Sequence, residues 1–407
     1  MGELVSSRGR WLDVAQGLRP VLHARAFAAQ RAARPVRDAR AWQGWRMEPA
    51  GEAAGRALGP EPLWLDFGRH LVGRFRIRCS GRLPAGARLL ACFGEVPAEV
   101  CEAPEEYPGT LGGEWLKALP LEVGADGWAE GPPRRALQWA RLWVEGGEPA
   151  GVAGAANALR LNAAEVVAMS SAGWDDPAPP ASLEQWRRDL DRVAIDTLRS
   201  CMQGVFEDGP KRDRRLWLGD LYLQAKACYP TFGGHALVKR CLYLFAGTCG
   251  DDGLVSPCVF ENPSWHGGHV LIPGYAWLFA PTLLDYLRGT DDRAAAADLF
   301  ALALHQHTLF DRHVNAQGLF DPPAKAVWRF VDWSETLETQ AAEQAIAVYS
   351  LNALLRLAPL VGRGELVAPL RERRDRVAGA LRSALRDPAL GLFRGEQGGQ
   401  LSWATHA

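Results

Sequence analysis

The sequence predicts a multidomain α+β protein, with an N-terminal antiparallel β-sandwich followed by a partial (α/α)6 toroid. Residues 72–79 alternate apolar and polar side chains with period two, which is typical of a strand with one buried face. Helical periodicity replaces this pattern from residue 182 onward, after a proline-rich break at 175–180. We therefore expect a β-sandwich domain over 60–175 and an incomplete barrel domain over 181–407, preceded by an uncertain N-terminal segment, 1–59.

The strand pattern is clearest where apolar and basic residues alternate. Phe75, Ile77 and Cys79 fall on one face of residues 72–79, and arginines occupy the other face. Similar short runs, separated by Gly, Pro and Asp clusters, lie at 63–67, 89–93, 142–145 and 166–169. Several short strands over one region predict a sandwich.

The C-terminal half has only helical patterns, and we expect helices and loops but no strands there. The apolar stripe of its first helix is Leu183, Trp186, Leu190, Val193, Ala194, Thr197 and Cys201. Further helices are predicted at 216–228, 234–247, 270–288, 291–313, 335–358 and 366–386.

A Gly-Leu pair recurs at Gly253, Gly318 and Gly391, each time after a predicted helix. A recurring helix pair indicates an α/α-toroid or an α-solenoid, although three coincidental turns would look the same. The predicted helices are fewer than six pairs require, and residues 401–407 resemble the first turn of another helix. We therefore expect the C-terminal part of the barrel to be absent.

The composition of the chain limits the classes of binding partner and the compartments that we expect. The chain has 46 Lys and Arg, 47 Asp and Glu, and a net charge of −1, which argues against a nucleic-acid or anionic membrane partner. The eight cysteines contain no Cys-x-x-Cys pair, which favours free thiols in a reducing compartment. Without a signal peptide or an apolar run of membrane-spanning length, the expected location is the cytoplasm.

Residues 207–220 carry the strongest chemical signal. This loop between two predicted helices holds four acidic residues, four basic residues and Trp217. A sugar site needs such a set, because the apolar face of the ring packs on an aromatic side chain while hydroxyls bind carboxylates and guanidinium groups. A salt-bridged loop anchored in the core by Trp217 would show the same composition.

This loop resembles the signature of the α-L-rhamnosidases of glycoside hydrolase family 78. The matching residues are Asp208, Pro210, Arg212, Asp213, Trp217, Gly219 and Asp220. Weaker similarities are the helix at 186–202, Leu65-Asp66-Phe67-Gly68 before Val72-Gly73, and Phe330-Val331-Asp332-Trp333. The resemblance covers roughly residues 60–407.

The resemblance implies an inverting glycosidase that acts on terminal α-L-rhamnosyl or related deoxy-sugar residues without a cofactor. Asp213 would be the general acid. The residues expected to bind the sugar are Asp208, Arg212, Trp217, Asp220, Trp265, Asp332 and Trp333. The family usually has a glutamate just after the arginine or one residue later, whereas this chain has Asp213 and then Arg214. An aspartate is one methylene shorter, which shortens its reach to the glycosidic oxygen.

Inversion also needs a general base, about 6.5–9.5 Å from the acid. In the resemblance this base is a glutamate beyond residue 407. Glu335 and Glu338 are the alternatives within the chain, but the first turn of a helix favours acidic residues in any case. We expect no metal, because His266 and His269, which lie beside Trp265, lack a third ligand at short spacing.

Two further function classes remain open. A non-catalytic sugar-binding protein or pseudoenzyme would account for the missing glutamate and the missing half-barrel. A toroid lyase would need a Tyr and His pair near a basic cleft, and the sequence offers none. For the glycosidase, we expect Asp208, Arg212, Asp213, Trp217, Asp220, Asp332 and Trp333 to converge on one face of the helical half.

The sequence therefore predicts that the 407-residue chain binds sugar but releases nitrophenol from an aryl α-L-rhamnoside slowly. Loss of one member of an acid–base pair typically lowers the rate by a factor of ~10²–10⁴. Uncovered inner helix faces should also make the purified chain poorly soluble. The control is Asp213→Asn; fast turnover that this substitution leaves unchanged would contradict both the expected truncation and the acid assignment.

Overall fold

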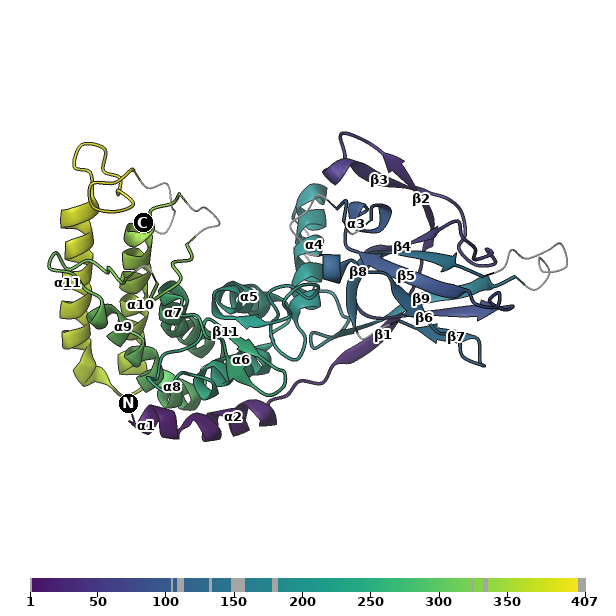
Figure 1. The fold of residues 1–407 in the computed structure, drawn as a ribbon. Coiled ribbons are helices and arrows are strands. Elements are labelled where there is room, and N and C mark those ends of the chain that lie inside the picture. The colour runs from purple at the N-terminus through teal and green to yellow at the C-terminus, as the bar shows by residue number, and fades with distance from the viewer. Residues whose placement is uncertain are drawn as a thin grey trace. The chain divides into compact units, whose positions relative to one another are not determined.

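The computed structural model describes residues 2–103, 105–107, 113–131, 134–147, 158–177, 182–323, 325–331 and 336–401 (Figure 1). The contacts within the chain divide it into two compact units. The helical unit comprises Met1–Pro20, Gly204–Asp208 and Arg215–Ala407. The sheet unit comprises Val21–Gln203 and Gly209–Arg214, so the tip of the 207–220 loop belongs to the sheet unit by its contacts.

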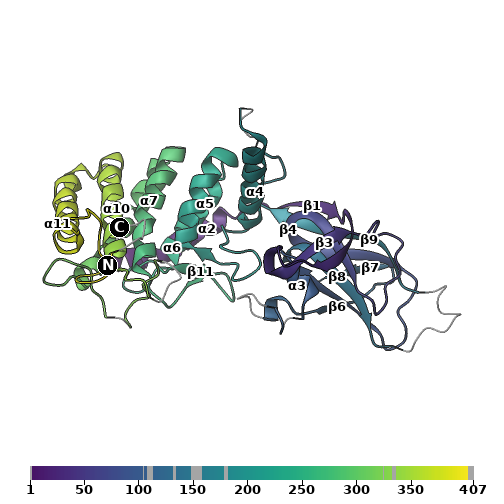
Figure 2. The ribbon, with the colours of Figure 1, turned by 90° about the horizontal axis from the view of Figure 1, so that it is seen from above.

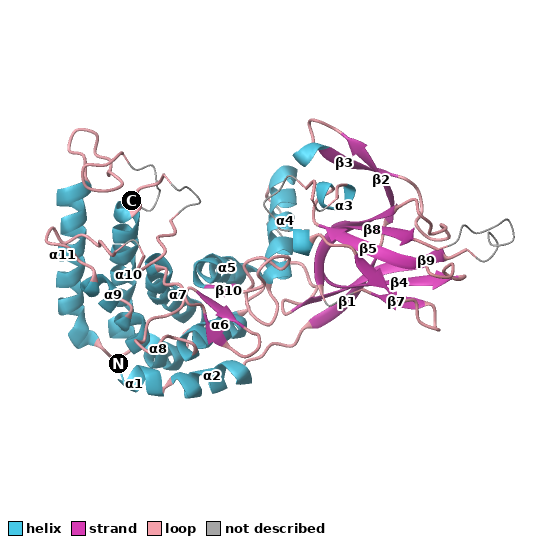
Figure 3. Cartoon of the chain, in the orientation of Figure 1, coloured by secondary structure: helices cyan, strands magenta, loops and turns pink. Residues whose placement is uncertain are grey.

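The sheet unit is built on one antiparallel nine-stranded sheet (Figure 3). Its main path runs β1-β9-β4-β8-β5-β6, with β2 and β7 also paired to β4 and β3 paired to β2. The strands are β1 (His23–Ala28), β2 (Arg31–Arg37), β3 (Trp45–Pro49), β4 (Leu63–Ser80), β5 (Arg88–Gly94), β6 (Leu119–Leu121), β7 (Trp128–Glu130), β8 (Arg135–Glu145) and β9 (Arg160–Ser170). The helices of this unit are α3 (Ala98–Cys101) and α4 (Gln185–Cys201).

Strand β4 confirms the period-two prediction. Phe75, Ile77 and Cys79 are buried in the core of the unit, and Arg74 and Arg78 are exposed. Because β4 pairs with four other strands, its apolar face forms the centre of that core. The predicted antiparallel sheet is thus present, with β4 as its longest member.

The pairing of β4 with β8 shifts register between Asp66 and Leu71, just after the Leu65-Asp66 pair of the 65–68 segment. Asp66 is buried, accepts the Gly68 N–H at 2.7 Å and pairs with Arg31 at 2.9 Å. Gly68 has a φ of +71°, and an added Cβ would lie 2.2 Å from the Gln30 side chain. The segment therefore needs both its aspartate and its glycine.

The helical unit consists of three helix hairpins, α5–α6, α7–α8 and α10–α11, with the additional helices α1, α2 and α9. Helix α7 contacts both α5 and α10, so the first helices of the three hairpins lie side by side (Figure 2). The bounds are α1 (Gly2–Ser6), α2 (Arg8–Gly17), α5 (Leu218–Thr231), α6 (His235–Gly247), α7 (Pro273–Thr290), α8 (Arg293–His305), α9 (Thr308–Arg312), α10 (Gln340–Leu360) and α11 (Val367–Leu385). Within the described ranges, no helix has the length and hydropathy needed to cross a membrane.

One expectation for this half was wrong: short strands occur beyond residue 182. They form a small antiparallel sheet of β10 (Leu216–Trp217), β11 (Cys258–Phe260) and β12 (His266–Gly267). Strands of two or three residues are too short to show period two in the sequence.

The Gly-Leu repeat corresponds to a recurring turn. Gly253, Gly318 and Gly391 all have φ between +71° and +78°, a region that L side chains rarely adopt. Each glycine donates its N–H to the carbonyl of a residue three or four positions earlier, at 2.9–3.0 Å. The same local chemistry thus ends successive hairpins of the helical unit.

The first helices of the chain, whose fold the sequence did not declare, pack on α6. Trp11 and Ala15 of α2 are buried, and the buried Arg240 of α6 donates to the Ala15 carbonyl at the end of α2. Gly247 allows this approach, because an added Cβ would lie 2.5 Å from Leu12 Cγ.

Helix α4 differs from its predicted packing. The expected buried stripe includes Trp186, Leu190 and Val193, but these three side chains are 60–62% exposed. The helix is buried instead through its last two turns, where Ile195, Leu198 and Cys201 lie in the interior. Periodicity located the helix but not the end by which it packs.

We predict that Gly247→Ala destabilises the protein by about 1–3 kcal/mol, because the methyl group overlaps Leu12. The matched control is Gly379→Ala in α11, where nothing lies within 4 Å of an added Cβ. There we expect a gain of about 0.5–1 kcal/mol, since alanine is the better helix former. Urea unfolding measures both; equal effects in the two variants would contradict the assigned contact.

Candidate active site

Residues 207–220 form a loop that is closed at its base by Asp208 and Arg215. The Asp208 N–H donates to the Arg215 carbonyl at 3.0 Å, and the Arg215 N–H donates to Asp208 Oδ1 at 3.2 Å. Because the Asp208 carboxylate takes part in this closure, the motif aspartate shapes the loop as well as supplying charge.

The tip of the loop, Gly209–Arg214, is held by a buried ion pair within the sheet unit. Lys211 Nζ binds Glu99 Oε2, and both side chains are less than 10% exposed. The same Glu99 oxygen accepts the Glu95 N–H at 2.7 Å. Lys211 is therefore an anchor of the loop, a role that the sequence analysis did not assign.

Asp213 lies at a conformationally unusual position. Asp213 and Arg214 have φ values of +67° and +54°, consecutive left-handed conformations in residues other than glycine. Such conformations persist only where surrounding contacts impose them, and they concentrate at functional sites. The Asp213 carboxylate lies 3.8 Å from the Arg212 guanidinium and is 24% exposed, so it is accessible to solvent.

In the helical unit, Tyr275 of α7 brings Trp217 and Asp220 together. The rings of Trp217 and Tyr275 meet edge to face, with centroids 6.2 Å apart. Gly219 permits this approach, because an added Cβ would lie 2.5 Å from the Tyr275 ring. The glycine of the Gly-Asp pair that ends the motif is thus a packing requirement of Tyr275.

The electrostatics of this cluster also centre on Tyr275. Burial raises the pKa of the Tyr275 hydroxyl, and the carboxylates of Asp220 and Asp208 raise it further. Burial likewise raises the pKa of Asp220. The indole N–H of Trp217 is buried and has no hydrogen-bond partner among the residues that the structure describes. A partly desolvated carboxylate beside aromatic rings fits a polar, ring-shaped ligand.

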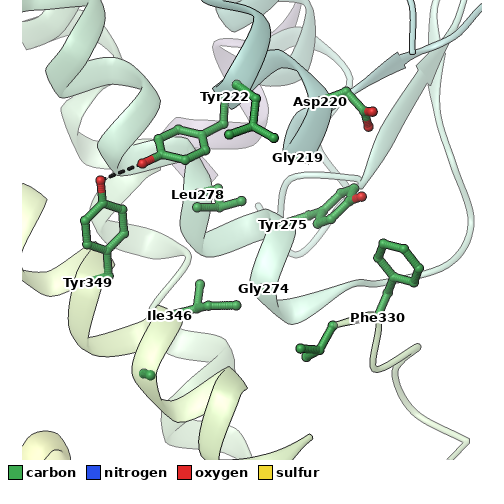
Figure 4. Close-up of a pocket in the computed structure, with 12 residues that line it drawn as sticks. Gly219, Asp220, Tyr222, Gly274, Tyr275, Leu278, Phe330, Ile346 and Tyr349 are labelled. Atoms are coloured by element: carbon green, nitrogen blue, oxygen red, sulfur yellow. Dashed lines mark hydrogen bonds between the residues drawn. The ribbon is translucent and has the colours of Figure 1, made fainter. Parts of the chain in front are cut away.

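A cavity of about 490 Å³ adjoins the cluster. Asp220 and Tyr275 lie at one end of it, and Tyr222 and Tyr349 lie at the other (Figure 4). The cavity is lined by Gly219, Asp220, Tyr222, Leu223, Gly274, Tyr275, Leu278, Phe330, Val331, Ala345, Ile346 and Tyr349.

The remaining predicted residues are placed differently. Trp265 packs one face of its ring under the buried Arg240, whose guanidinium carbon lies 5.1 Å from the ring centroid. Asp332, Trp333 and Glu335 lie outside the described residues. The expected convergence of the whole set therefore stays a prediction; the structure brings together Asp208, Trp217 and Asp220 around Tyr275.

Two glutamates of the helical unit, Glu338 and Glu343, interact with other residues of the protein. Glu338 accepts the Gln400 N–H at 2.8 Å. Glu343 of α10 lies 3.5 Å from Arg329, and burial raises its pKa to about 7. Only 1% of Glu343 is exposed, so its carboxyl is closed off from solvent. Among the described residues, no three His, Cys, Asp or Glu side chains are grouped to hold a metal ion.

Sequence reasoning missed Tyr275, Tyr222 and Tyr349. Tyr275 follows the Gly-rich segment 262–269 and precedes a helix, but nothing in that pattern indicates which residue it meets. Its partner Gly219 is the only hint, since a glycine at a helix start often marks a close approach.

Two family models match the chain. The bacterial α-L-rhamnosidase six-hairpin glycosidase domain matches residues 184–402. The glycosyl hydrolase family 78 α-rhamnosidase N-terminal domain matches residues 29–129. No curated protein sequence matches.

Solved structures agree with these models. A rhamnosidase from Klebsiella oxytoca with rhamnose bound is 36% identical, with a TM-score of 0.88; the alignment covers 98% of this chain and 77% of that one. A family 78 rhamnosidase of Bacillus sp. GL1 shares the fold at 20% identity and a TM-score of 0.71, covering 88% of this chain and 36% of the other. An α-L-rhamnosidase of Streptomyces avermitilis complexed with L-rhamnose shares the fold at 15% identity and a TM-score of 0.62. That alignment covers 93% of this chain and 33% of the other.

The antiparallel sheet, the helix hairpins and the matching domain model thus place the chain in the six-hairpin glycosidase class. Within that class, the chain belongs to the α-L-rhamnosidases of glycoside hydrolase family 78. The resemblance found in the 207–220 loop is confirmed.

We predict that Lys211→Met destabilises the sheet unit by about 3–5 kcal/mol, because it leaves the Glu99 carboxylate buried without its cation. The double variant Lys211→Met/Glu99→Gln should recover most of this loss. As a matched control, Arg88→Met removes an exposed pair with Glu145 and should cost less than about 1 kcal/mol. Chemical denaturation distinguishes them; similar losses for Lys211→Met and Arg88→Met would refute the anchoring role.

Proposed function

We propose that this protein binds a terminal α-L-rhamnosyl or related deoxy-sugar residue and that Asp213 protonates the glycosidic oxygen in an inverting hydrolysis. The observation that carries the proposal is the cluster of Asp208, Trp217 and Asp220 about Tyr275. The rhamnose bound in the Klebsiella oxytoca relative supports the choice of sugar.

The roles follow from side-chain chemistry. Asp220 and Asp208 accept hydrogen bonds from sugar hydroxyls, and Trp217 offers an apolar ring edge. Arg212 is about half exposed, and its guanidinium is available to a second pair of hydroxyls. Asp332, Trp333 and Trp265 are proposed as further contacts of the same sugar, on the strength of the family motif.

Asp213 suits the acid role by its accessibility and its imposed backbone conformation. An acid with a fixed main chain loses little freedom when the substrate arrives. No described residue is proposed as the general base. Binding is therefore the primary test, and the effect of Asp213→Asn on turnover is the second.

A non-catalytic sugar-binding protein is the second candidate. The observation that favours it is the aspartate at position 213, where the family usually has a longer glutamate. Both candidates bind rhamnose. Only the enzyme shows turnover that Asp213→Asn abolishes; this substitution suits the site, because asparagine tolerates a positive φ.

We also propose a reducing compartment, the cytoplasm, as the site of action. All eight cysteines are free, and seven of them are buried. Burial raises the pKa of several of these thiols, for example that of Cys79 to about 11, which keeps them protonated and unreactive.

We predict that Asp220→Asn weakens L-rhamnose binding by about 10–100-fold, the usual loss for hydrogen bonds to a charged group. The same variant should be more stable at neutral pH by about 0.5–1 kcal/mol. The raised pKa means that the folded state disfavours the Asp220 carboxylate, so its destabilising effect grows as pH rises through that pKa and asparagine removes it.

Calorimetric titration and thermal unfolding measure the two effects of Asp220→Asn. The control is Asp13→Asn, because the Asp13 side chain on α2 is exposed and its replacement should change neither quantity. Unchanged rhamnose affinity in Asp220→Asn would count against the proposed sugar contact.

A further inference from the structure

We propose that Glu343, in the first turn of α10, is a positioning residue of the candidate site: it faces Arg329 and sets how firmly the 325–331 segment is held as a wall of the cavity. This inference rests on the proposed function, because it takes Asp220, which lines the same cavity, to contact the sugar. It adds the regulation of that site, which neither the motif nor the choice of sugar determines.

The 325–331 segment supplies one wall of the cavity. Phe330 lines it and meets Tyr275 edge to face, with centroids 6.0 Å apart (Figure 4). The Trp328 N–H donates to the Leu271 carbonyl at 2.8 Å, and the rings of Trp328 and Phe330 lie 5.3 Å apart. If the segment moved away, Phe330 would leave Tyr275, around which the proposed sugar contacts are grouped.

The start of α10 buries three polar side chains, those of Gln340, Glu343 and Gln344. The two glutamines bind a neighbouring loop: Gln340 donates to the Phe320 carbonyl at 3.1 Å, and Gln344 accepts the Phe320 N–H at 2.8 Å. Glu343 differs, because its buried Oε2 has no hydrogen-bond partner within the described part of the chain. A buried carboxyl in this condition is costly, and it makes the local structure sensitive to its charge.

The group that faces Glu343 is the guanidinium of Arg329. Arg329 Nε lies 3.5 Å from Glu343 Oε2, and both atoms are buried, but no hydrogen bond joins them. At its other end the guanidinium donates to the Pro322 carbonyl at 3.2 Å and lies 3.5 Å from the Asp321 carboxylate. Among the described residues, Arg329 is the charged group that shifts the Glu343 pKa. Arg329 therefore joins its segment to α10 through a contact whose strength depends on the charge of Glu343.

The charge of Glu343 changes near neutral pH. Burial raises the pKa of Glu343 to about 7, although the nearby Arg329 charge lowers it. When the 325–331 segment lifts away, water reaches the carboxyl, and the pKa falls toward the ordinary value of 4.5. Between these two values the closed arrangement, in which the segment covers Glu343, takes up a proton that the open arrangement does not.

The direction of the pH effect follows from this proton uptake. Closing is strongest below about pH 4.5 and weakens by up to roughly tenfold for each pH unit as the pH rises to about 7. Above that value both arrangements carry an ionised Glu343, and closing changes no further. The wall of the cavity is therefore held firmly in acid and loosely above neutral pH.

The first measurement is hydrogen exchange of the 325–331 segment in the 407-residue chain without ligand. Glu343→Gln keeps the shape of the protonated side chain and removes its titration. At about pH 8 we expect the segment of this variant to exchange at least several-fold more slowly than that of the unaltered protein. Most of the difference should disappear at about pH 5, where Glu343 of the closed arrangement is protonated. Comparison at equal pH cancels the intrinsic pH dependence of exchange.

A second variant, Arg329→Met, keeps the test decisive if Glu343→Gln does not fold. Because the Arg329 charge lowers the Glu343 pKa, its removal should move the midpoint of the exchange transition to higher pH. A substitution that merely loosened the segment would speed exchange without moving this midpoint. The matched control is Glu372→Gln in α11, at a side chain that is 80% exposed, which should leave the exchange of the segment unchanged.

Calorimetric titration with methyl α-L-rhamnoside connects the segment to the site. Between about pH 5 and about pH 8 the unaltered protein should lose several-fold more affinity than Glu343→Gln. The ratio of the two affinities at each pH cancels the titration of Asp208 and Asp220, which both proteins share. Glu372→Gln should follow the unaltered protein throughout.

The outcomes separate the two proposals. If the exchange of the 325–331 segment depends on pH in the same way in Glu343→Gln and in the unaltered protein, the inference is overturned. If exchange responds but the ratio of affinities stays constant with pH, Glu343 does not position the site; the inference is overturned and the proposed function stands. If exchange responds and methyl α-L-rhamnoside binds neither protein, the coupling of Glu343 to the cavity wall stands and the sugar proposal fails.

Discussion

The close approach of Tyr275 to the start of α5 is the contact on which the candidate site depends. It exists because Gly219 has no side chain, so that the tyrosine ring occupies the space of a Cβ. With the ring in that position, Trp217 and Phe330 both meet it edge to face, and Asp220 lines the adjoining cavity. Any side chain at position 219 would displace the ring and separate these residues.

The grouping of two carboxylates around Tyr275 lowers the stability of the folded protein. Asp208 and Asp220 both lie close enough to Tyr275 to raise its pKa, and Asp220 itself is partly desolvated. A protein selected for stability alone would not gather carboxylates around a buried phenol. The unfavourable electrostatics are what a ligand with several hydroxyls would relieve, because it supplies hydrogen-bond donors to the carboxylates.

The loop that carries Asp213 is positioned by a different set of contacts. The buried Lys211–Glu99 pair fixes its tip within the sheet unit, and Asp208 closes its base through backbone N–H bonds. A charged pair with so little exposure is costly to form but imposes one partner and one geometry. A single imposed geometry suits this loop, because two consecutive residues of its main chain have left-handed conformations.

Much of the fold followed from local patterns. The alternation over residues 72–79, the helical periodicity after residue 182 and the Gly-Leu turns each reflect backbone geometry that a few neighbouring residues decide. The sequence failed where the deciding partner is distant. The short strand β10 depends on pairing with β11, about forty residues further along the chain. The apolar stripe of α4 marks a helix but does not say that Trp186, Leu190 and Val193 are exposed.

For the site, the sequence by itself determined the family motif and its residues, because spacing within one loop is a local property. The resemblance also led to the hypothesis that Asp213 stands where the family usually has a glutamate. Only the tertiary structure decided which residues complete the site: Tyr275, Phe330, Tyr222 and Tyr349 come from segments separated by up to 127 residues. The positions of the three tyrosines arise from the packing of three helices, and no spacing rule along one chain specifies which faces of those helices meet.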